Sequence, residues 1–199
     1  MREIIRLALV LTLICAISAA ALTIARNRLG PRIEKQNDFY VRGPALSRLF
    51  GQPAQELLDQ KISFTVEEDV YPIFYIQEDG RITGLAVEAA GEGGYGGPVT
   101  VMIGLDLDRK EALGLEIILH NETPGLGSQI EKSGFRNQWK GLSIAEPADL
   151  RSQGGQIDAI SGATYSSKAV MTGTNRIISL ISHHREEILA EIRETEKEP

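Results

Sequence analysis

The stretch from Val70 to Ala90 reads VYPIFYIQEDGRITGLAVEAA and predicts two β-strands joined by a tight turn. β-Branched and aromatic side chains dominate both halves, which is typical of strands. Asp79 and Gly80 stand between the halves, and an Asp-Gly pair in this position is a strong hairpin signal. A sheet built on this hairpin is therefore the expected centre of the fold.

Further strand patterns lie on both sides of the hairpin. The run ISFTV at 62–66 precedes it, and VTVMIGLDLD at 99–108 and ALGLEIILH at 112–120 follow it. Residues 166–196 instead carry isoleucines near the helical repeat, which predicts a C-terminal helix. These are Ile177, Ile181, Ile188 and Ile192. The expected fold class is α+β, with a mixed or antiparallel sheet packed against helices.

The N-terminal region contains a long apolar run. Leu7–Ala25 holds 19 residues without a charge, enough for a helix to cross a hydrocarbon core of about 30 Å. A signal peptide cleaved near Ala19–Ala21 is the alternative, but the apolar part of a signal is usually shorter. Arginine and lysine flank the run on both sides, so the positive-inside rule gives no orientation.

Three regions follow from these patterns. We expect a membrane anchor over residues 1–28, a juxtamembrane helical connection over 29–60, and one globular domain over 61–199 that ends in the C-terminal helix. The length after the anchor suits a single core.

Composition and charge exclude several classes of function. The net charge is −6 and no basic stripe is interleaved with aromatic residues, so nucleic acid is a poor candidate partner. The only cysteine, Cys15, lies in the apolar run, which excludes an internal disulfide and a CxxC metal or iron–sulfur site. His120, His183 and His184 form no zinc motif. We expect no metal site and no catalytic residue, and any redox chemistry would need a bound organic cofactor.

Three glycine-containing loops are candidate parts of a cofactor pocket, because glycine lets the backbone approach a ligand and adopt positive φ. They are GEGGYGGPV at 91–99, ETPGLG at 122–127 and SGAT at 161–164. Taken singly, the first is more simply a hairpin or bulge and the second a turn that starts a helix. None matches a P-loop, a dinucleotide fingerprint or a GxSxG nucleophile turn.

The stretch DAISGATYSS at 158–167 places five hydroxyl side chains just before the predicted C-terminal helix. Helix capping explains one of them, because helix N-termini leave unpaired N–H donors. A bound or attached phosphoryl group would use the same donors. Gly162 and Ala163 leave space around the hydroxyl of Thr164. The side chains that would support a phosphoryl group there are Ser161, Ser166, Ser167 and Lys168.

At these residues the chain resembles the membrane-anchored FMN-binding family. That family includes the G subunit of the Rnf electron transport complex and the C subunit of the sodium-translocating NADH:quinone reductase. The resemblance covers most of the chain. It is carried by the anchor, by GYGGPV, by HNETPGLG followed by Trp139, and by DAISGATYSS.

The resemblance implies a covalent cofactor and its site. FMN would be joined through its phosphate to the hydroxyl of Thr164 by a separate flavin transferase, which reads Asp158, Ser161, Gly162 and Ala163. The isoalloxazine ring would lie along Glu122, Thr123, Gly125, Leu126 and Gly127, with Tyr95, Gly96 and Gly97 nearby. Trp139 would stack on the pocket wall, although a lone tryptophan is more often part of the core. Independently of the resemblance, the strand pattern places His120 at a strand end, where it could line the pocket.

The implied function is that of an electron-carrying flavoprotein subunit of a membrane-bound, ion-translocating ferredoxin:NAD oxidoreductase (Rnf) complex, a redox relay that is not catalytic alone. Its expected partners are the other membrane and redox subunits, the flavin transferase and the lipid bilayer. It would span the cytoplasmic membrane once, with the FMN domain on the outer face. The alternatives are the C subunit of the quinone reductase, for which this chain is short, and a flavin-free, membrane-anchored assembly module in which SGAT only caps a helix.

Overall fold

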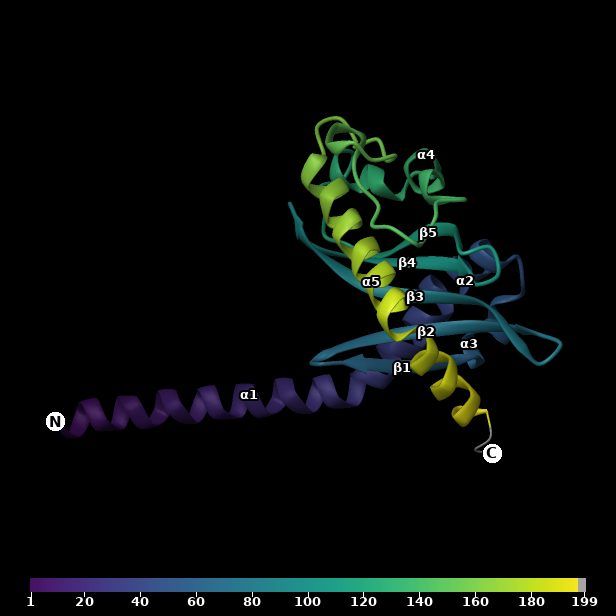
Figure 1. The fold of residues 1–199 in the computed structure, drawn as a ribbon. Helices are drawn as coiled ribbons and strands as arrows, with labels where there is room; N and C mark the ends of the chain where they lie inside the picture. The colour runs from purple at the N-terminus through teal and green to yellow at the C-terminus, as the bar shows by residue number, and fades with distance from the viewer. Residues whose placement is uncertain (197–199) are drawn as a thin grey trace. The chain divides into compact units, whose positions relative to one another are not determined.

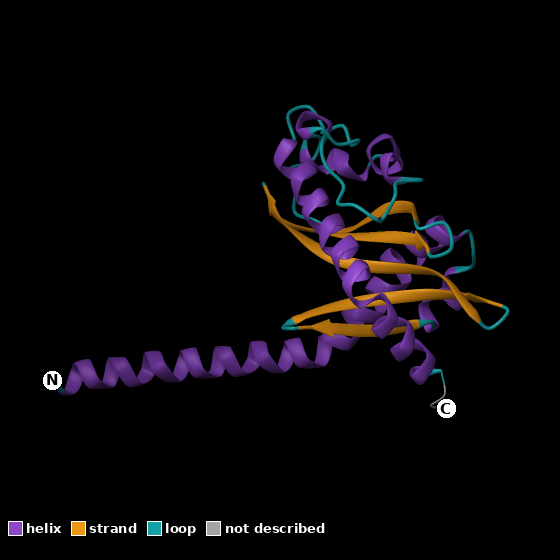
Figure 2. Ribbon diagram, in the orientation of Figure 1, coloured by secondary structure: helices purple, strands orange, loops and turns teal. Residues whose placement is uncertain are grey.

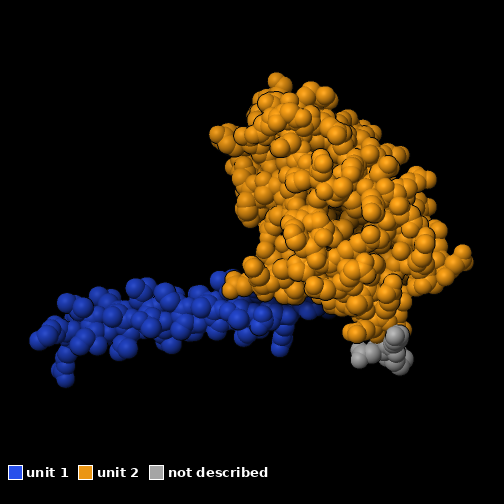
Figure 3. Space-filling view, in the orientation of Figure 1, with its two compact units in different colours: residues 1–40 blue, residues 41–199 orange. Residues whose placement is uncertain are grey.

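The structure of the protein is a computed structural model, and it describes residues 1–196. The chain forms two compact units, residues 1–40 and residues 41–199 (Figure 3). The expected domain over 61–199 therefore ends with three residues, 197–199, that lie outside the described part.

The first unit is dominated by one long helix, α1 (Arg2–Asn37). None of its residues is buried, and it is long and apolar enough to cross a membrane, judged by length and composition. Its 36 residues correspond to about 54 Å of helix, which exceeds the thickness of a hydrocarbon core. A short π-helix, η1 (Asp38–Arg42), follows α1.

A five-stranded antiparallel sheet forms the centre of the second unit (Figure 2). The strands follow one another in space as they do along the chain. The predicted hairpin is present: Tyr75 lies opposite Leu85, and Asp79 and Gly80 turn the chain with φ angles of 51° and 74°. The strands are β1 (Lys61–Val66), β2 (Asp69–Glu78), β3 (Arg81–Gly94), β4 (Gly97–Asp106) and β5 (Glu111–Leu119).

Helices cover both faces of this sheet (Figure 1). On one face α5 (Thr164–Thr195) packs on the strands, and all four isoleucines that predicted it are buried. On the other face α2 (Gly43–Phe50) and α3 (Ala54–Asp59) form a smaller apolar cluster with the sheet. The members of that cluster from the sheet are Phe74, Ala86 and Met102. The predicted α+β class, with an antiparallel sheet and packed helices, is confirmed.

Two details differ from the sequence patterns. Helices α2 and α3 belong to the second compact unit, whereas the sequence placed them in a connection before the domain. α5 begins at Thr164, two residues earlier than the pattern suggested, and it bends at His184, which has non-helical angles of φ −120° and ψ 15°.

The segment between β5 and α5 contains only short helical turns. They are η2 (Gly127–Glu131), α4 (Ser133–Arg136), η3 (Asn137–Trp139) and η4 (Arg151–Gln153). The helix that the ETPGLG turn was expected to start is therefore a 3₁₀ turn, η2, followed by one α-helical turn, α4. Phe135 and Trp139 anchor this segment to the core, where their rings pack edge to face at 5.0 Å.

Candidate functional site

A pocket of about 340 Å³ lies at the N-terminal end of α5. Three segments far apart in the sequence meet there: the β3–β4 turn, the loop after β5, and the turn that leads into α5 (Figure 1). The three glycine-containing loops are thus brought together. The lining residues are Tyr95, Glu122, Thr123, Leu126, Gly127, Gly162, Ala163, Thr164, Tyr165 and Ser166.

Most of the first glycine-containing segment, GEGGYGGPV, belongs to β-strands. β3 continues to Gly94 and β4 starts at Gly97, so only Tyr95 and Gly96 form the tip of the hairpin, with irregular pairing between Gly91 and Gly94. This matches the simpler interpretation of that sequence as a hairpin. A Cβ on Gly96 would collide with the carbonyl group of Asn121, so glycine is needed for the tip to pack against the loop after β5.

Glu122 links the three segments from inside the pocket. Glu122 is buried, with only 5% of its surface exposed to solvent. Ser166 Oγ, on α5, donates a hydrogen bond to Oε2 at 2.8 Å, and the Gly96 N–H donates to Oε1 at 3.3 Å. A Cβ on Gly127 would lie 2.5 Å from Oε2, and one on Gly94 would lie 2.5 Å from Oε1. The carboxylate of Glu122 therefore occupies space that a side chain at Gly94 or Gly127 would fill.

His120 holds the backbone of Glu122 in place. Its Nδ1 accepts a hydrogen bond from the Glu122 N–H at 3.0 Å, and its Nε2 lies 3.0 Å from Glu131 Oε1. An Nδ1 that accepts from a backbone amide leaves the ring proton on Nε2, facing Glu131. His120 is thus a supporting residue at the end of β5, and it does not line the pocket.

The surroundings of Glu122 differ from those of the other two buried glutamates. Glu88 pairs with Arg42, whose Nε lies 2.6 Å from Oε1, and Glu116 pairs with Arg48 at 2.8 Å and with Arg136. Within residues 1–196, Glu122 pairs with no cation and is held by neutral donors only. A buried carboxylate without a counter-ion is costly, so Glu122 is a candidate polar contact for a ligand of this pocket.

Thr164 is the first residue of α5 and is exposed. Its hydroxyl forms no hydrogen bond with another described residue. Ala163 occupies the N-cap position without a side-chain capping bond, so the expected hydroxyl cap is not found. The unpaired N–H groups of the first helical turn therefore lie beside the free hydroxyl of Thr164.

The neighbouring serines use their hydroxyl groups inside the protein. Ser167 Oγ donates to the Ala163 carbonyl and accepts from the Ile160 N–H, both at 3.0 Å, while Ser166 is bonded to Glu122. Both serines are buried. The sequence suggested that these two hydroxyl groups would donate to a phosphoryl group at Thr164. In the structure they donate to Glu122 and to the Ala163 carbonyl instead. Ser161 and Lys168 remain exposed beside Thr164 along the chain.

Large side chains with exposed apolar surface form the rim of the pocket. Tyr95 is 81% exposed, Tyr165 is 68% exposed and Leu126 is 46% exposed. They come from the three different segments. An apolar rim around a small number of polar groups suits a flat aromatic ligand better than a small ion.

Asp158 lies outside the lining of the pocket. Its two carboxylate oxygens accept hydrogen bonds from Arg151 Nε at 2.6 Å and Nη2 at 3.1 Å. The hydrogen bond from Arg151 holds the pKa of the Asp158 carboxyl below its usual range. Gln138 also bonds both the N–H and the carbonyl of Asp158. Sequence patterns gave no sign of Arg151 or Gln138, because both contacts depend on the fold of the preceding loop.

Two other candidate residues have simpler roles. Trp139 is 1% exposed and packs in the core, so it is not a wall of the pocket. Gly125 turns the loop with a φ of 76° and its N–H donates to Ser128 Oγ at 2.9 Å, while Gly97 has a φ of 109° at the start of β4. These glycines shape the loops and do not line the pocket.

Residues 94–179 match the family described as FMN-binding domain. This range includes the pocket and the N-terminal half of α5. The structure is also similar to the crystal structure of the C subunit of the Na(+)-translocating NADH-quinone reductase from Parabacteroides distasonis. The TM-score is 0.58 and the identity 25%, over 77% of this chain and 94% of that chain.

Three similar proteins are each named as the G subunit of an ion-translocating oxidoreductase complex. The Methanosarcina acetivorans protein is 33% identical over 138 residues, which cover 64% of this chain and 72% of that protein. The Haemophilus influenzae protein is 35% identical over 113 residues, and this chain spans about half of its length, 54%. The Pseudomonas aeruginosa protein is 28% identical over 203 residues, 95% of this chain and 94% of that protein.

Proposed function

Because this chain belongs to the family of G subunits of ion-translocating oxidoreductase complexes, we propose that it carries electrons through an FMN held at the N-terminal end of α5. The observation that carries this proposal is the free, exposed hydroxyl of Thr164 at a helix N-terminus, beside a pocket with an apolar rim and a buried carboxylate. These features fit the two ends of FMN, a phosphate and a flat ring.

The phosphate end would be attached to the chain at Thr164. The donor would be a flavin dinucleotide. Thr164 Oγ1 would lose its proton and bond to the phosphorus of the FMN half, while the phosphoanhydride bond of the dinucleotide breaks and the nucleoside monophosphate leaves. A flavin transferase would catalyse this exchange. The N–H groups of the first turn of α5 would donate hydrogen bonds to the phosphate oxygens. Lys168 stands four residues later, on the same face of the helix, and would add a positive charge. Gly162 and Ala163 keep the approach to Thr164 open because they have almost no side chain.

The ring end would lie against the pocket. The side chains of Tyr95, Leu126 and Tyr165 would cover its apolar surface and exclude water, while Glu122 would offer the polar contact. Bound FMN supplies the electron-transfer chemistry, and the protein contributes position and electrostatic environment. The covalent tether prevents loss of the cofactor on a side of the membrane where free FMN is scarce.

The complex would be a membrane-bound ferredoxin:NAD oxidoreductase of the Rnf type. α1 would be its single membrane span, the FMN domain would face the outside of the cytoplasmic membrane, and the other membrane and redox subunits would be the electron partners. The named relatives support the G subunit of such a complex. The C subunit of a sodium-translocating quinone reductase is the second candidate, because the structure resembles one such protein.

The mass of the intact chain tests the attachment. After coexpression with a flavin transferase, the purified protein should gain the mass of one FMN less one water, and without the transferase it should have the mass of the bare chain. A bare mass under both conditions, with the transferase shown to be active on another substrate, would support a flavin-free assembly module.

Cysteine labelling tests the orientation. In a variant with Cys15→Ala, a cysteine in place of Arg193, which is exposed near the end of α5, should react with a membrane-impermeant maleimide in intact spheroplasts. A cysteine in place of Arg2, before the apolar run, is the matched control and should react only after lysis. The reverse pattern would place the FMN domain in the cytoplasm.

A further inference from the structure

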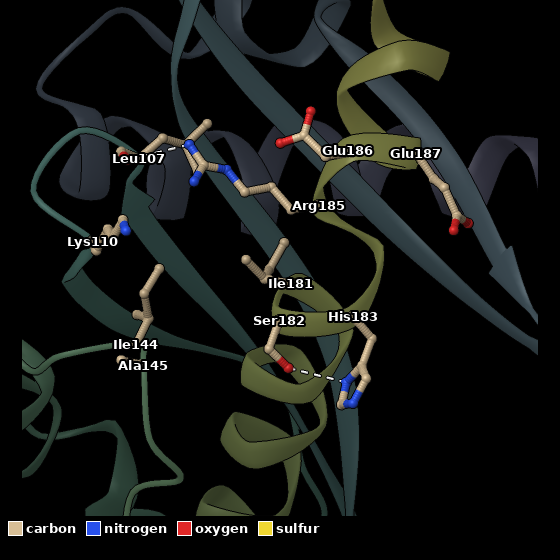
Figure 4. Close-up of a pocket in the computed structure, with 10 residues that line it drawn as sticks. All are labelled: Leu107, Lys110, Ile144, Ala145, Ile181, Ser182, His183, Arg185, Glu186 and Glu187. Atoms are coloured by element: carbon tan, nitrogen blue, oxygen red, sulfur yellow. Dashed lines mark hydrogen bonds between the residues drawn. The ribbon is translucent and has the colours of Figure 1, made fainter.

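A second cavity, of about 400 Å³, lies along the other half of α5 and shares no lining residue with the pocket at Thr164. It is open to solvent on one side and is bordered by the bend of α5, the β4–β5 turn and the segment that follows η3 (Figure 4). Leu107, Ile144 and Ile181 form its apolar wall, and Lys110 and Arg185 are its cationic residues. A cavity of this volume is large enough for a small organic molecule.

Arg185 has unused hydrogen-bonding capacity inside this cavity. Its Nε is buried and has no hydrogen-bond partner, and its Nη2 reaches only the Leu107 carbonyl, at 3.5 Å. No carboxylate among residues 1–196 forms an ion pair with it. A guanidinium group carries five donors, and buried donors are nearly always paired. The guanidinium of Arg185 therefore keeps hydrogen-bond donors that no described residue uses.

The backbone brings a second cation to the same cavity. Lys110 lies on the β4–β5 turn with a φ of 57°, an uncommon conformation for a residue with a side chain. On the other side α5 leaves helical geometry at His184, directly before Arg185. Figure 4 shows Arg185 extending from α5 toward Leu107, with Lys110 and Ile144 on the facing side.

The acidic residues nearby do not neutralise these cations. Glu187 lies 3.1 Å from His184 Nδ1 and its side chain is 67% exposed. Glu186 is exposed at the rim. The Ser182 hydroxyl donates to the Ser179 carbonyl at 2.9 Å, so it is engaged within α5. In the described part of the chain, residues 1–196, no carboxylate forms an ion pair with Arg185 or Lys110.

We propose that this cavity is a binding site for a small organic carboxylate with an apolar body. The guanidinium of Arg185 and the ammonium of Lys110 hold the carboxylate, and the wall of Leu107, Ile144 and Ile181 covers the apolar part. An arginine suits this role because its donors match the two oxygens of a carboxylate. The site is separate from the proposed flavin pocket and does not depend on FMN.

Benzoate is a suitable probe, measured by nuclear magnetic resonance on the ¹⁵N-labelled full chain in non-ionic detergent micelles. The Nε–H signal of Arg185, assigned by its loss in Arg185→Lys, should shift and saturate with a dissociation constant on the order of 1 mM. Benzamide has the same shape without the charge and should cause no saturable shift. Acetate has the charge without the apolar body and should bind about tenfold more weakly.

Two variants separate specific binding from general attraction of anions. Lys110→Gln should weaken benzoate binding about tenfold. Arg109→Gln removes a neighbouring charge on the same turn, where the arginine side chain is 76% exposed and faces Asp106, and should leave binding unchanged. Equal responses to benzoate and benzamide, a shift that never saturates, or equal weakening by the two variants would each overturn the proposal. The comparison of benzoate with benzamide holds even if a variant fails to fold.

Discussion

Thr164→Ala is expected to abolish the covalent flavin completely, because the phosphoester needs the oxygen that alanine lacks. The fold should remain, since the Thr164 side chain is exposed and its hydroxyl bonds to no other described residue. Substitutions at such positions change the free energy of unfolding by about 0.5 kcal/mol or less. The measurement is denaturing gel electrophoresis with in-gel flavin fluorescence, after coexpression with a flavin transferase.

Thr172→Ala is the matched control for this prediction. Thr172 is also exposed on α5, and its hydroxyl donates to the Lys168 carbonyl at 3.1 Å. The same chemical change two turns along the helix should leave a full fluorescent band. A band that persists in Thr164→Ala would mean that another hydroxyl carries the flavin, with Ser161 the first to test. No band in the wild type would remove the covalent proposal altogether.

The sheet and the last helix could be predicted because their signals are local. The Asp79–Gly80 turn needs positive φ at both residues, and few residue pairs other than Asn-Gly and Asp-Gly supply this. The isoleucines of α5 repeat at helical spacing, so a short stretch of sequence is enough to predict the helix. The packing of α2 and α3 on the second face of the sheet was not predicted, although the sequence of β2 indicates a strand that is buried on both faces. Residues 73–76, Ile-Phe-Tyr-Ile, are apolar without alternation, which is the pattern of a strand buried on both faces.

The division of roles among the hydroxyls could not be predicted. Ser166 donates to Glu122, which is 44 residues away along the chain, and Ser167 bonds to the turn around Ile160. Composition alone presents Thr164, Ser166 and Ser167 as equivalent. The structure separates them, since two are turned inward to hold the loops and one is left exposed at the helix end. Thr164 itself was singled out by resemblance to the FMN-binding family.

The largest expected effect on stability comes from Gly91→Ala, in the part of β3 that α5 crosses. A Cβ at this position would collide with the carbonyl of Ala169 and would lie 2.9 Å from its carbon, and it would also strike the N of Gly173. These are backbone atoms of α5, so no side chain can move aside. Overpacking a core commonly costs about 1–3 kcal/mol, and a clash with helix backbone should reach or exceed the upper end of that range.

The clash with α5 should also disturb the pocket, because α5 carries Thr164 and Ser166 at its N-terminal end. The full chain without flavin, in detergent micelles, should unfold at a midpoint lower by roughly 6–12 °C, followed by the fluorescence of its single tryptophan, Trp139. Gly134→Ala is the control, since a Cβ there meets nothing within 4 Å and alanine favours the helix. An unchanged midpoint in Gly91→Ala would mean that α5 can move away from β3. In that case Thr164 could not be held beside Glu122 by the contact between helix and sheet, and the loops alone would have to position it.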